Sequence, residues 1–304
     1  MTLTGPSMSR SAPNTDATTP GMEAGKAIMP STVESSICPL SLSVAGTAAA
    51  GAATAALSPA AAAQQRRVLG TVVDYSAGVP SASAVKAAGH IGAVRYVSQR
   101  RPGADWMRGK PVTIGETRDY KANGLAVASV YQFGRAETAD WKRGALGAAE
   151  HAPQAIALHK AAGGPTGRPI YVAIDDNPTL TQFNSLINPY LKAMGVALNA
   201  AGYQLGVYGN YYTIAWCLED GIGSYFWQHD WGSRGQIHSR ANIHQVAGRQ
   251  AYIEGIQVDI NNVYASDWGQ WTPGQGSTLT NMTPGDWSTL LQGSSQLSSS
   301  WLPR

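Results

Sequence analysis

The sequence predicts a mixed α/β fold of the (β/α)8, TIM-barrel type, compact and with short last connections. Three observations predict it: eight short β-type runs, helical segments between most of them, and no G-x-G-x-x-G after the first run. An open, doubly wound sheet is the structural alternative, and the missing glycine motif disfavours it. The runs occupy roughly 205 residues between 68 and 272, near the lower end for such a barrel, so we expect loops rather than helices in the last connections.

Each predicted element has a local signal. Thr113-x-x-Glu116 is a capping box that opens a helix, and Asn123-Gly124 is a typical helix end. Strands are indicated by β-branched runs such as VLGTVVD and PIYVAID. The predicted strands are 68–74, 93–98, 125–132, 169–175, 204–208, 225–230, 242–246 and 256–261. The predicted helices are 81–89, 113–124, 139–162, 180–201 and 214–218.

The two ends of the chain differ from this barrel region, which we bound at 64–272. Residues 1–63 are predicted to be an export segment, because the apolar region 37–57 leads to an A-x-A sequence with cleavage expected after Ala63. An uncleaved anchor is the alternative, although the alanine-rich stretch is weakly hydrophobic for a bilayer span. Residues 273–304 are predicted to be a flexible Ser/Gly/Thr-rich tail. We therefore expect a secreted or cell-envelope protein with no membrane span after cleavage.

Composition narrows the classes of function. A net charge of +3 and a charged fraction of 13% do not suggest a nucleic-acid partner. Two cysteines exclude a zinc cluster built on thiolates and a disulfide framework. The histidine spacing fits no standard metal motif, and a Walker loop and a nucleophile elbow are both absent. We expect a monomer with neither metal nor cofactor.

Acidic residues collect where a barrel does its chemistry, at the carboxyl ends of strands. Only seven of the 19 acidic residues are glutamates, and none of those falls at a predicted strand end. The strand-end acids are aspartates, Asp230 at the end of strand 225–230 among them, and four of them are the candidate catalytic residues: Asp74, Asp175, Asp259 and Asp176.

Alternation along the strands predicts where these acids point. In strand 256–261 the aliphatic residues share one face, which should meet the helices, so Asp259 points into the barrel mouth. By the same reasoning Asp175 faces inward. Asp176 points away unless the strand has already ended.

Residues suited to sugars lie around the acids. Aromatic rings offer flat faces for pyranose rings, and amide or imidazole groups offer hydrogen bonds to hydroxyls, although any one of them is more often a packing residue. Arg95 lies mid-strand and needs a partner, either Asp74 or Asp259 in the mouth or a purely structural ion pair. The predicted substrate-binding residues are Arg95, Gln132, Asn177, Tyr208, Trp227, His229 and Gln245.

Several long segments also resemble a known family. They are LGTVVDYSAGVPSASAVKAAGHIGAVRYVSQRR, RPIYVAIDDNP, YQLGVYGNYY and VDINNVYASDWGQW, and they cover essentially the whole barrel region. They resemble the secreted actinobacterial glycoside hydrolase-like family, a domain of unknown function with a TIM-barrel fold. That family is itself similar to the family 25 lysozymes, which cleave the glycan strand of peptidoglycan.

The resemblance implies roles for individual residues. Asp74 takes the strand-one position of the lysozymes, Asp175 the first position of their D-x-E motif, and Asp259 the strand-eight position. The glutamate that serves the lysozymes as general acid falls on Asn177, which has no proton to donate to a leaving group.

Two functions therefore stay open, both with a cell-wall polysaccharide as partner. One is a secreted glycosidase acting on peptidoglycan or a similar polymer, with two carboxyl groups across the scissile bond. Asp175 and Asp259 supply that pair, Asp74 orients, and Asp176 replaces the missing acid if its backbone turns inward. The other is a non-catalytic glycan-binding or regulatory protein of the wall.

Overall fold

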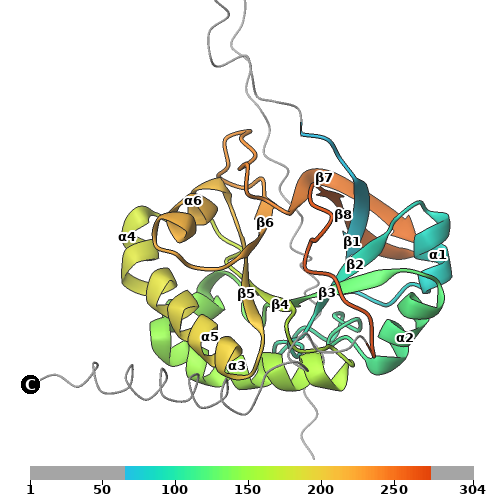
Figure 1. Ribbon diagram of the computed structural model, residues 1–304, viewed down its shortest axis with the longest axis horizontal. Helices are drawn as coiled ribbons and strands as arrows, with labels where there is room; N and C mark the ends of the chain where they lie inside the picture. The colour runs from blue at the N-terminus through green and yellow to red at the C-terminus, as the bar shows by residue number, and fades with distance from the viewer. Residues whose placement is uncertain (1–65, 275–304) are drawn as a thin grey trace, which may run out of the picture. The chain divides into compact units, whose positions relative to one another are not determined.

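The computed structural model describes residues 66–274, and its eight strands close into a barrel in chain order (Figure 1). The closed eight-stranded barrel of a mixed α/β fold is thus confirmed. The predicted export segment 1–63 and nearly all of the tail 273–304 lie outside the described residues. The strands are β1 (Gly70–Asp74), β2 (Gly92–Tyr96), β3 (Ala126–Tyr131), β4 (Pro169–Ala173), β5 (Gln204–Gly209), β6 (Tyr225–His229), β7 (Ile243–Ile253) and β8 (Ile256–Val263).

The last strand departs from the predicted (β/α)8 pattern. Neighbouring strands from β1 to β7 are parallel, whereas β8 is antiparallel to both β7 and β1. Only Glu254 and Gly255 join β7 to β8, with φ of 51° and 73°. Two consecutive residues in this left-handed conformation form a hairpin turn. A two-residue connection is too short for the crossover that a parallel strand requires. The prediction of a regular alternation is wrong here, and the short last connections are present.

Helices cover the outside of the barrel, with α3 and α5 side by side on one flank and α1 and α2 on the other (Figure 1). Ser81 and Thr113 cap the first two helices by accepting hydrogen bonds from the main-chain N–H three residues later. The α-helices are α1 (Ala82–Ala87), α2 (Ile114–Ala122), α3 (Gly144–Ala161), α4 (Leu180–Gln182), α5 (Asn188–Ala200) and α6 (Tyr211–Glu219). The other helical turns are η2 (Ala136–Thr138), η3 (Asp140–Arg143) and the π-helical η4 (Phe183–Ile187).

Buried side chains form two layers, one inside the barrel and one between the barrel and the helices. In β4 Tyr171 and Ala173 belong to the inner layer, while Val172 and Ile174 belong to the outer one. This is the alternation that the sequence predicts, and Asp175 follows Ala173 on the inward side.

One end of the barrel is filled with aromatic side chains. Trp268, which follows β8, lies inside the barrel, and its backbone carbonyl accepts a hydrogen bond from the Tyr171 hydroxyl at 2.9 Å. Gly92 makes room for this ring, because a Cβ atom there would lie 2.2 Å from the Ala126 carbonyl oxygen and 3.0 Å from the indole. The strand-end aspartates lie at the opposite end, at which β1 to β6 finish.

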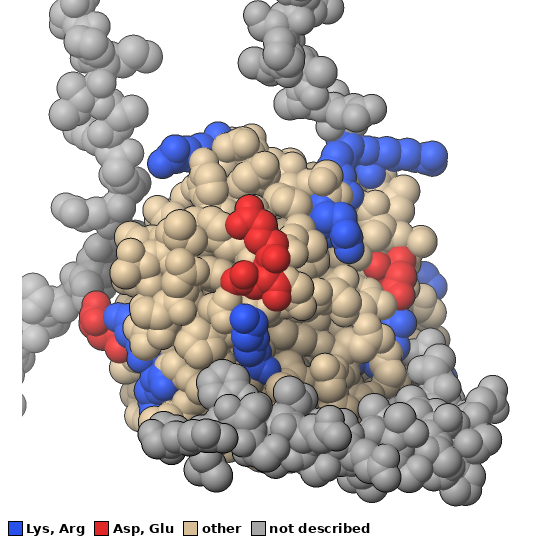
Figure 2. Space-filling model, turned by 60° about the vertical axis from the view of Figure 1, so that its left-hand side comes forward, with Lys and Arg blue, Asp and Glu red and all other residues tan. Residues whose placement is uncertain are grey.

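No helix among residues 66–274 is both long enough and apolar enough to cross a bilayer. On the face of these residues seen in Figure 2, charged side chains are sparse and form small groups, without the broad basic patch that binds phosphate backbones.

Candidate active site

Two carboxyl groups face each other at the open end of the barrel. Asp74 is the last residue of β1, and its register partner on the antiparallel strand β8 is Asp259. Directly opposed residues of an antiparallel pair have Cβ atoms about 4.5–5.5 Å apart. Asp259 is the fourth of the eight residues of β8 rather than at its end, and it is paired with the last residue of β1 because β8 runs in the opposite direction. The predicted location is right, although the strand-end reasoning behind it does not hold for this strand.

Asp74 is buried, with 2% of its surface exposed. Its Oδ2 accepts hydrogen bonds from the side-chain amides of Asn261, at 2.8 Å, and Gln245, at 3.0 Å. Burial raises the pKa of Asp74 to about 7, the negative charge of Asp259 adds to the effect, and the two amide donors oppose it. Asp74 therefore keeps its proton under conditions in which an exposed aspartate has lost it.

Asp259 is the more accessible member of this pair. Its Oδ1 accepts a hydrogen bond of 2.7 Å from the Gln250 side chain, which lowers its pKa. Partial burial has the larger effect and the charge of Asp175 adds to it, so that the pKa of Asp259 is raised.

Asp175 completes the set of acids, two residues after β4 ends. Its Oδ2 accepts a hydrogen bond of 2.9 Å from Gln132 Nε2. The pKa of Tyr96 and that of Tyr208 are raised by burial and, to a smaller extent, by the charges of Asp74, Asp175 and Asp259 together. The three carboxyl groups therefore belong to one mouth.

Two predicted substrate-binding rings form the floor of this mouth. Tyr208 and Trp227 are 5% and 2% exposed, so neither ring is free to stack on a sugar. The Tyr208 hydroxyl donates to Gln245 Oε1 at 2.6 Å, and Trp227 Nε1 donates to Asn261 Oδ1 at 2.8 Å. Through these bonds the floor orients the two amides that hold Asp74.

Arg95 is not in the mouth. Its guanidinium lies in the outer layer, where it is fully buried, forms an ion pair with Glu116 of α2 and stands 3.8 Å from the centroid of the Tyr75 ring. Pairing with Asp74 or Asp259 is therefore a wrong prediction, and the structural ion pair is the alternative that holds. The reason is that the carboxylate of Glu116 extends to Arg95 and not to the start of its own helix.

Asp176 and Asn177 follow in the loop after β4. Because the strand has ended, Asp176 does not point away: Asp175 and Asp176 line one hollow at this end of the barrel. The Oδ2 atom of Asp176 accepts a hydrogen bond of 3.3 Å from Trp141 Nε1. Asn177 is exposed, and its Oδ1 accepts a hydrogen bond of 3.0 Å from Asn210 Nδ2. The position that the lysozyme resemblance assigns to the general acid thus carries an amide directed at the loop after β5.

His229 is buried beside the ring of Tyr208, with 5.0 Å between the ring centroids. Its Nε2 lies 3.2 Å from the Ile174 carbonyl oxygen, which assigns the proton to Nε2 and leaves Nδ1 as an acceptor. Burial lowers the pKa of His229, so the ring is neutral near pH 7. It supports the end of β4 from the side of β6.

Lys110 is a residue of the mouth that the sequence did not reveal. It lies in the long loop after β2 and is 5% exposed. Its Nζ donates to the Gln132 carbonyl oxygen at 2.8 Å and stands 3.8 Å from the Tyr96 ring centroid. Burial lowers the pKa of this ammonium to about 7. Asn261 was also missed, although it shares a strand face with Asp259 and that signal was available.

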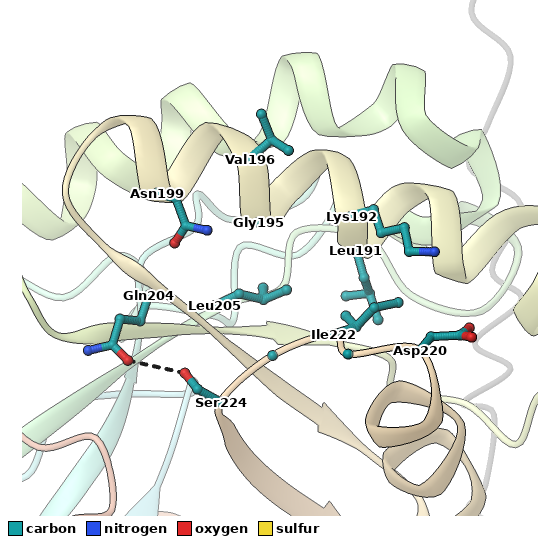
Figure 3. Close-up of a pocket in the computed structure, with 12 residues that line it drawn as sticks. Leu191, Lys192, Gly195, Val196, Asn199, Gln204, Leu205, Asp220, Ile222 and Ser224 are labelled. Atoms are coloured by element: carbon teal, nitrogen blue, oxygen red, sulfur yellow. Dashed lines mark hydrogen bonds between the residues drawn. The ribbon is translucent and has the colours of Figure 1, made fainter. Parts of the chain in front are cut away.

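A second hollow, of about 370 Å3, lies on the outside of the barrel between α5 and the starts of β5 and β6 (Figure 3). Leu205 and Ile222 line it together with Lys192 and Asp220. It holds one carboxyl group and lies away from the strand ends that carry the acids. Within residues 66–274, no group of three or more His, Cys, Asp or Glu is placed to hold a metal ion. The acid-lined mouth is therefore the candidate active site.

Comparison with known proteins identifies relatives of the barrel. A family model described as "Rv2525c-like, glycoside hydrolase-like domain" matches residues 83–263. A protein of Mycobacterium tuberculosis (strain ATCC 25618 / H37Rv) named "Putative peptidoglycan hydrolase Rv2525c" is 49% identical over 205 residues, which are 67% of this chain and 84% of that protein. The crystal structure of the M. tuberculosis Tat-secreted protein Rv2525c in complex with L-tartrate is 48% identical, with a TM-score of 0.64, and covers 67% of this chain and 100% of that one.

A more distant match is the structure of a family 25 glycosyl hydrolase from Bacillus anthracis, 10% identical with a TM-score of 0.40, covering 67% of this chain and 92% of that one. The family assignment rests on the nearer matches, because the family model spans more than half of the chain and the mycobacterial protein matches over most of its own length. The protein belongs to the Rv2525c-like family of glycoside hydrolase-like domains.

Proposed function

We propose that this protein is a secreted glycoside hydrolase that acts on a cell-wall polysaccharide, peptidoglycan or a similar polymer, at the open end of its barrel. The family, the peptidoglycan hydrolase name of the mycobacterial relative and the description of that relative as Tat-secreted support the proposal. The observation that carries it is the pair Asp74 and Asp259, two directly opposed acids with raised pKa values. Groups with such shifts are characteristic of acid–base sites.

The geometry fits the two roles that glycoside hydrolysis requires. One carboxyl group protonates the leaving oxygen, and another faces the positive charge that develops on the sugar. Asp259 reaches the mouth and acts as the general acid, while the buried Asp74 keeps a proton within the pair. Asp175, held by Gln132, acts from the side of β4. It serves as the nucleophile or, on an N-acetylated sugar, orients the carbonyl group of the substrate.

The test is product formation by the full chain. Purified peptidoglycan and, separately, arabinogalactan are incubated with the protein, and new reducing ends are sought by mass spectrometry. We expect products from the wild type and none from Asp259→Asn or Asp175→Asn. Asp220→Asn, which changes the carboxyl group in the other hollow, is the matched control and should keep the activity. Equal product formation by all four proteins would contradict the proposal.

A second candidate, non-catalytic glycan binding, is favoured by one observation. Asn177 stands where the lysozyme resemblance places the general acid, and its amide is bound to Asn210. A barrel that has lost its proton donor retains the mouth and binds glycan without breaking it. This candidate predicts that the protein sediments with insoluble peptidoglycan, that Asp259→Asn sediments equally well, and that neither releases products.

A further inference from the structure

A hollow of about 510 Å3 opens beside Asp175, and neither the acid pair nor the floor of the mouth accounts for it. Its volume lies in the range of about 300–1,000 Å3 that is usual for ligand sites. The walls come from the loop between β3 and α3, from the end of β4, from α4 and from the residue two positions after β6. The lining residues are Arg135, Ala136, Glu137, Trp141, Lys142, Asp175, Asp176, Gln182 and Trp231.

The β3–α3 wall is held in a fixed shape. Both oxygens of the buried Asp140 accept main-chain hydrogen bonds, from Phe133 at 2.8 Å and Gly134 at 2.7 Å. Gly134 is packed so closely that a Cβ atom would lie 1.8 Å from the Thr138 carbonyl oxygen. Ala136 has φ of 49°, a conformation that costs about 1–3 kcal/mol and persists where the surroundings impose it. This wall of the hollow is therefore held by contacts within the protein itself.

Trp231 presents an exposed apolar surface at this hollow. It is 58% exposed, in contrast to the buried Trp141 and Trp227. Its ring centroid lies 6.5 Å from that of His229, whose side chain is itself buried against Tyr208. The indole thus lies near a buried ring and leaves much of its own surface exposed. A flat apolar ring that lines a polar cavity matches a pyranose, which has apolar ring faces and a rim of hydroxyls.

The charges around the hollow select against a strongly anionic ligand. Three acids, Glu137, Asp175 and Asp176, outnumber the two bases Arg135 and Lys142, and Lys142 is already paired with Glu137 at 2.8 Å. A phosphate or a polyanion would meet this acidic excess, whereas an uncharged sugar would find donors and acceptors. Asp176 is fixed by its bond from Trp141 and offers its second oxygen to a hydroxyl.

We infer that the hollow is a second sugar subsite, adjoining the bond-breaking position at Asp175, in which an uncharged sugar unit of the glycan stacks on Trp231. The inference rests on the proposed glycan-binding function of the mouth. It adds that the protein engages at least two consecutive units of a chain and prefers long strands to short ones. Asp175 is the residue that the two positions share.

The test measures affinity against chain length with the full-length protein. The probe is a set of soluble peptidoglycan glycan strands, freed of stem peptides, made uncharged by amidation of their lactyl carboxyl groups, and sorted from the disaccharide to the octasaccharide. Isothermal titration gives Kd for the wild type, Trp231→Ala, Trp231→Phe and the control Tyr252→Ala, which removes another exposed aromatic side chain, in the β7–β8 hairpin. We expect Trp231→Ala to weaken octasaccharide binding about ten-fold, and Trp231→Phe and Tyr252→Ala to bind within about two-fold of the wild type.

Different results would overturn the subsite at Trp231 and the glycan-binding function of the mouth. If the wild type binds long strands and Asp175→Asn weakens that binding while Trp231→Ala does not, the subsite is wrong and the glycan-binding mouth stands. If the wild type binds no strand of any length, the glycan function itself is overturned and the subsite with it. Circular dichroism of each variant shows that a weakened Kd does not reflect loss of the fold.

Discussion

The two ends of the barrel bury polar groups in opposite ways. Beside the end that is filled with aromatic side chains, which we call the closed end, three side chains of the outer layer form a buried, uncharged network: His159 Nδ1 lies 2.8 Å from Ser129 Oγ, which also accepts from Trp271 Nε1 at 3.1 Å. At the open end two carboxyl groups oppose each other, and burial raises the pKa of each. Opposed like charges destabilise a strand pair. The closed end is thus built for stability, and the open end keeps an unfavourable arrangement that chemistry can use.

The largest expected effect is a loss of activity without a loss of stability, from a substitution at the open end. Asp259→Asn should lower the rate of product release by about 10²–10⁴-fold, because a general acid contributes that much. The same change removes the repulsion on Asp74 and should leave the melting temperature unchanged or higher. Rates from reducing-end assays and melting curves from calorimetry check both parts. A variant that loses stability together with activity would contradict the contrast between the two ends.

A substitution at the closed end should have the reverse effect, a loss of stability without a loss of binding. Trp271 is fully buried and its main chain bridges to Val127, so Trp271→Ala should lower the free energy of unfolding by about 3–5 kcal/mol. Urea denaturation measures the loss. The protein that remains folded should keep its affinity for peptidoglycan, since the change lies at the far end of the barrel. A specific loss of binding by folded protein would show that the ends are not independent.

The two ends should also respond to pH in opposite directions. Asp74 has a folded-state pKa of about 7, above the value of about 3.9 for an unfolded chain. Between these values the folded state binds more protons, so its contribution to stability falls as the pH rises. Burial lowers the pKa of His159 to about 4, below the unfolded value of about 6.5, so its contribution is lost as the pH falls through that interval.

Single substitutions separate these opposed effects, each on the order of 3 kcal/mol. Asp74→Asn should stabilise the protein more at about pH 7.5 than at about pH 4.5, and His159→Gln should make stability less sensitive to acid. Chemical denaturation at the two pH values measures both trends. A gain from Asp74→Asn that is larger at the acidic pH would show that the folded-state pKa of Asp74 is not raised.

The smallest expected effect concerns the position that the lysozyme resemblance assigns to the general acid. Asn177→Ala removes one part-buried hydrogen bond from Asn210, so it should cost about 0.5–1.5 kcal/mol and leave product release within about two-fold. The same reducing-end assay applies. A large loss of activity in this variant would contradict this prediction. It would show that the Asn177 side chain takes part in the reaction, at the position where the lysozyme resemblance places the general acid.

Local patterns were sufficient for much of the fold and for the acids. The side-chain alternation of β4 and β8 predicts that Asp175 and Asp259 face the mouth, and the structure brings both there. The direction of β8 was missed because strand 242–246 was predicted to be too short to reach Glu254-Gly255. A strand extended to Ile253 would have shown two β runs separated by two residues, which indicates a hairpin.

Long-range contacts were beyond the reach of the sequence pattern. The capping box at Thr113 predicts the start of α2 correctly, but it cannot reveal that Glu116 turns to Arg95, a residue of another element. Lys110 lies in the loop after β2 and Trp141 in η3, and the place of both segments beside the strand-end acids depends on tertiary packing. The rings of Tyr208 and Trp227 were predicted to bind sugars, but both are buried in the folded barrel. Burial of a side chain depends on tertiary packing, which the pattern of a single strand does not reveal.

The most direct test is the titration of the acid pair itself. Carbon-detected NMR of carboxyl-labelled aspartates, assigned with Asp74→Asn and Asp259→Asn, follows each protonation in the folded protein. The pair should hold a proton to near neutrality, with an Asp74 midpoint at about pH 7 that moves to lower pH in Asp259→Asn. A midpoint near 3.9, the ordinary value for aspartate, would contradict the claim that the open end of the barrel stores a proton for catalysis.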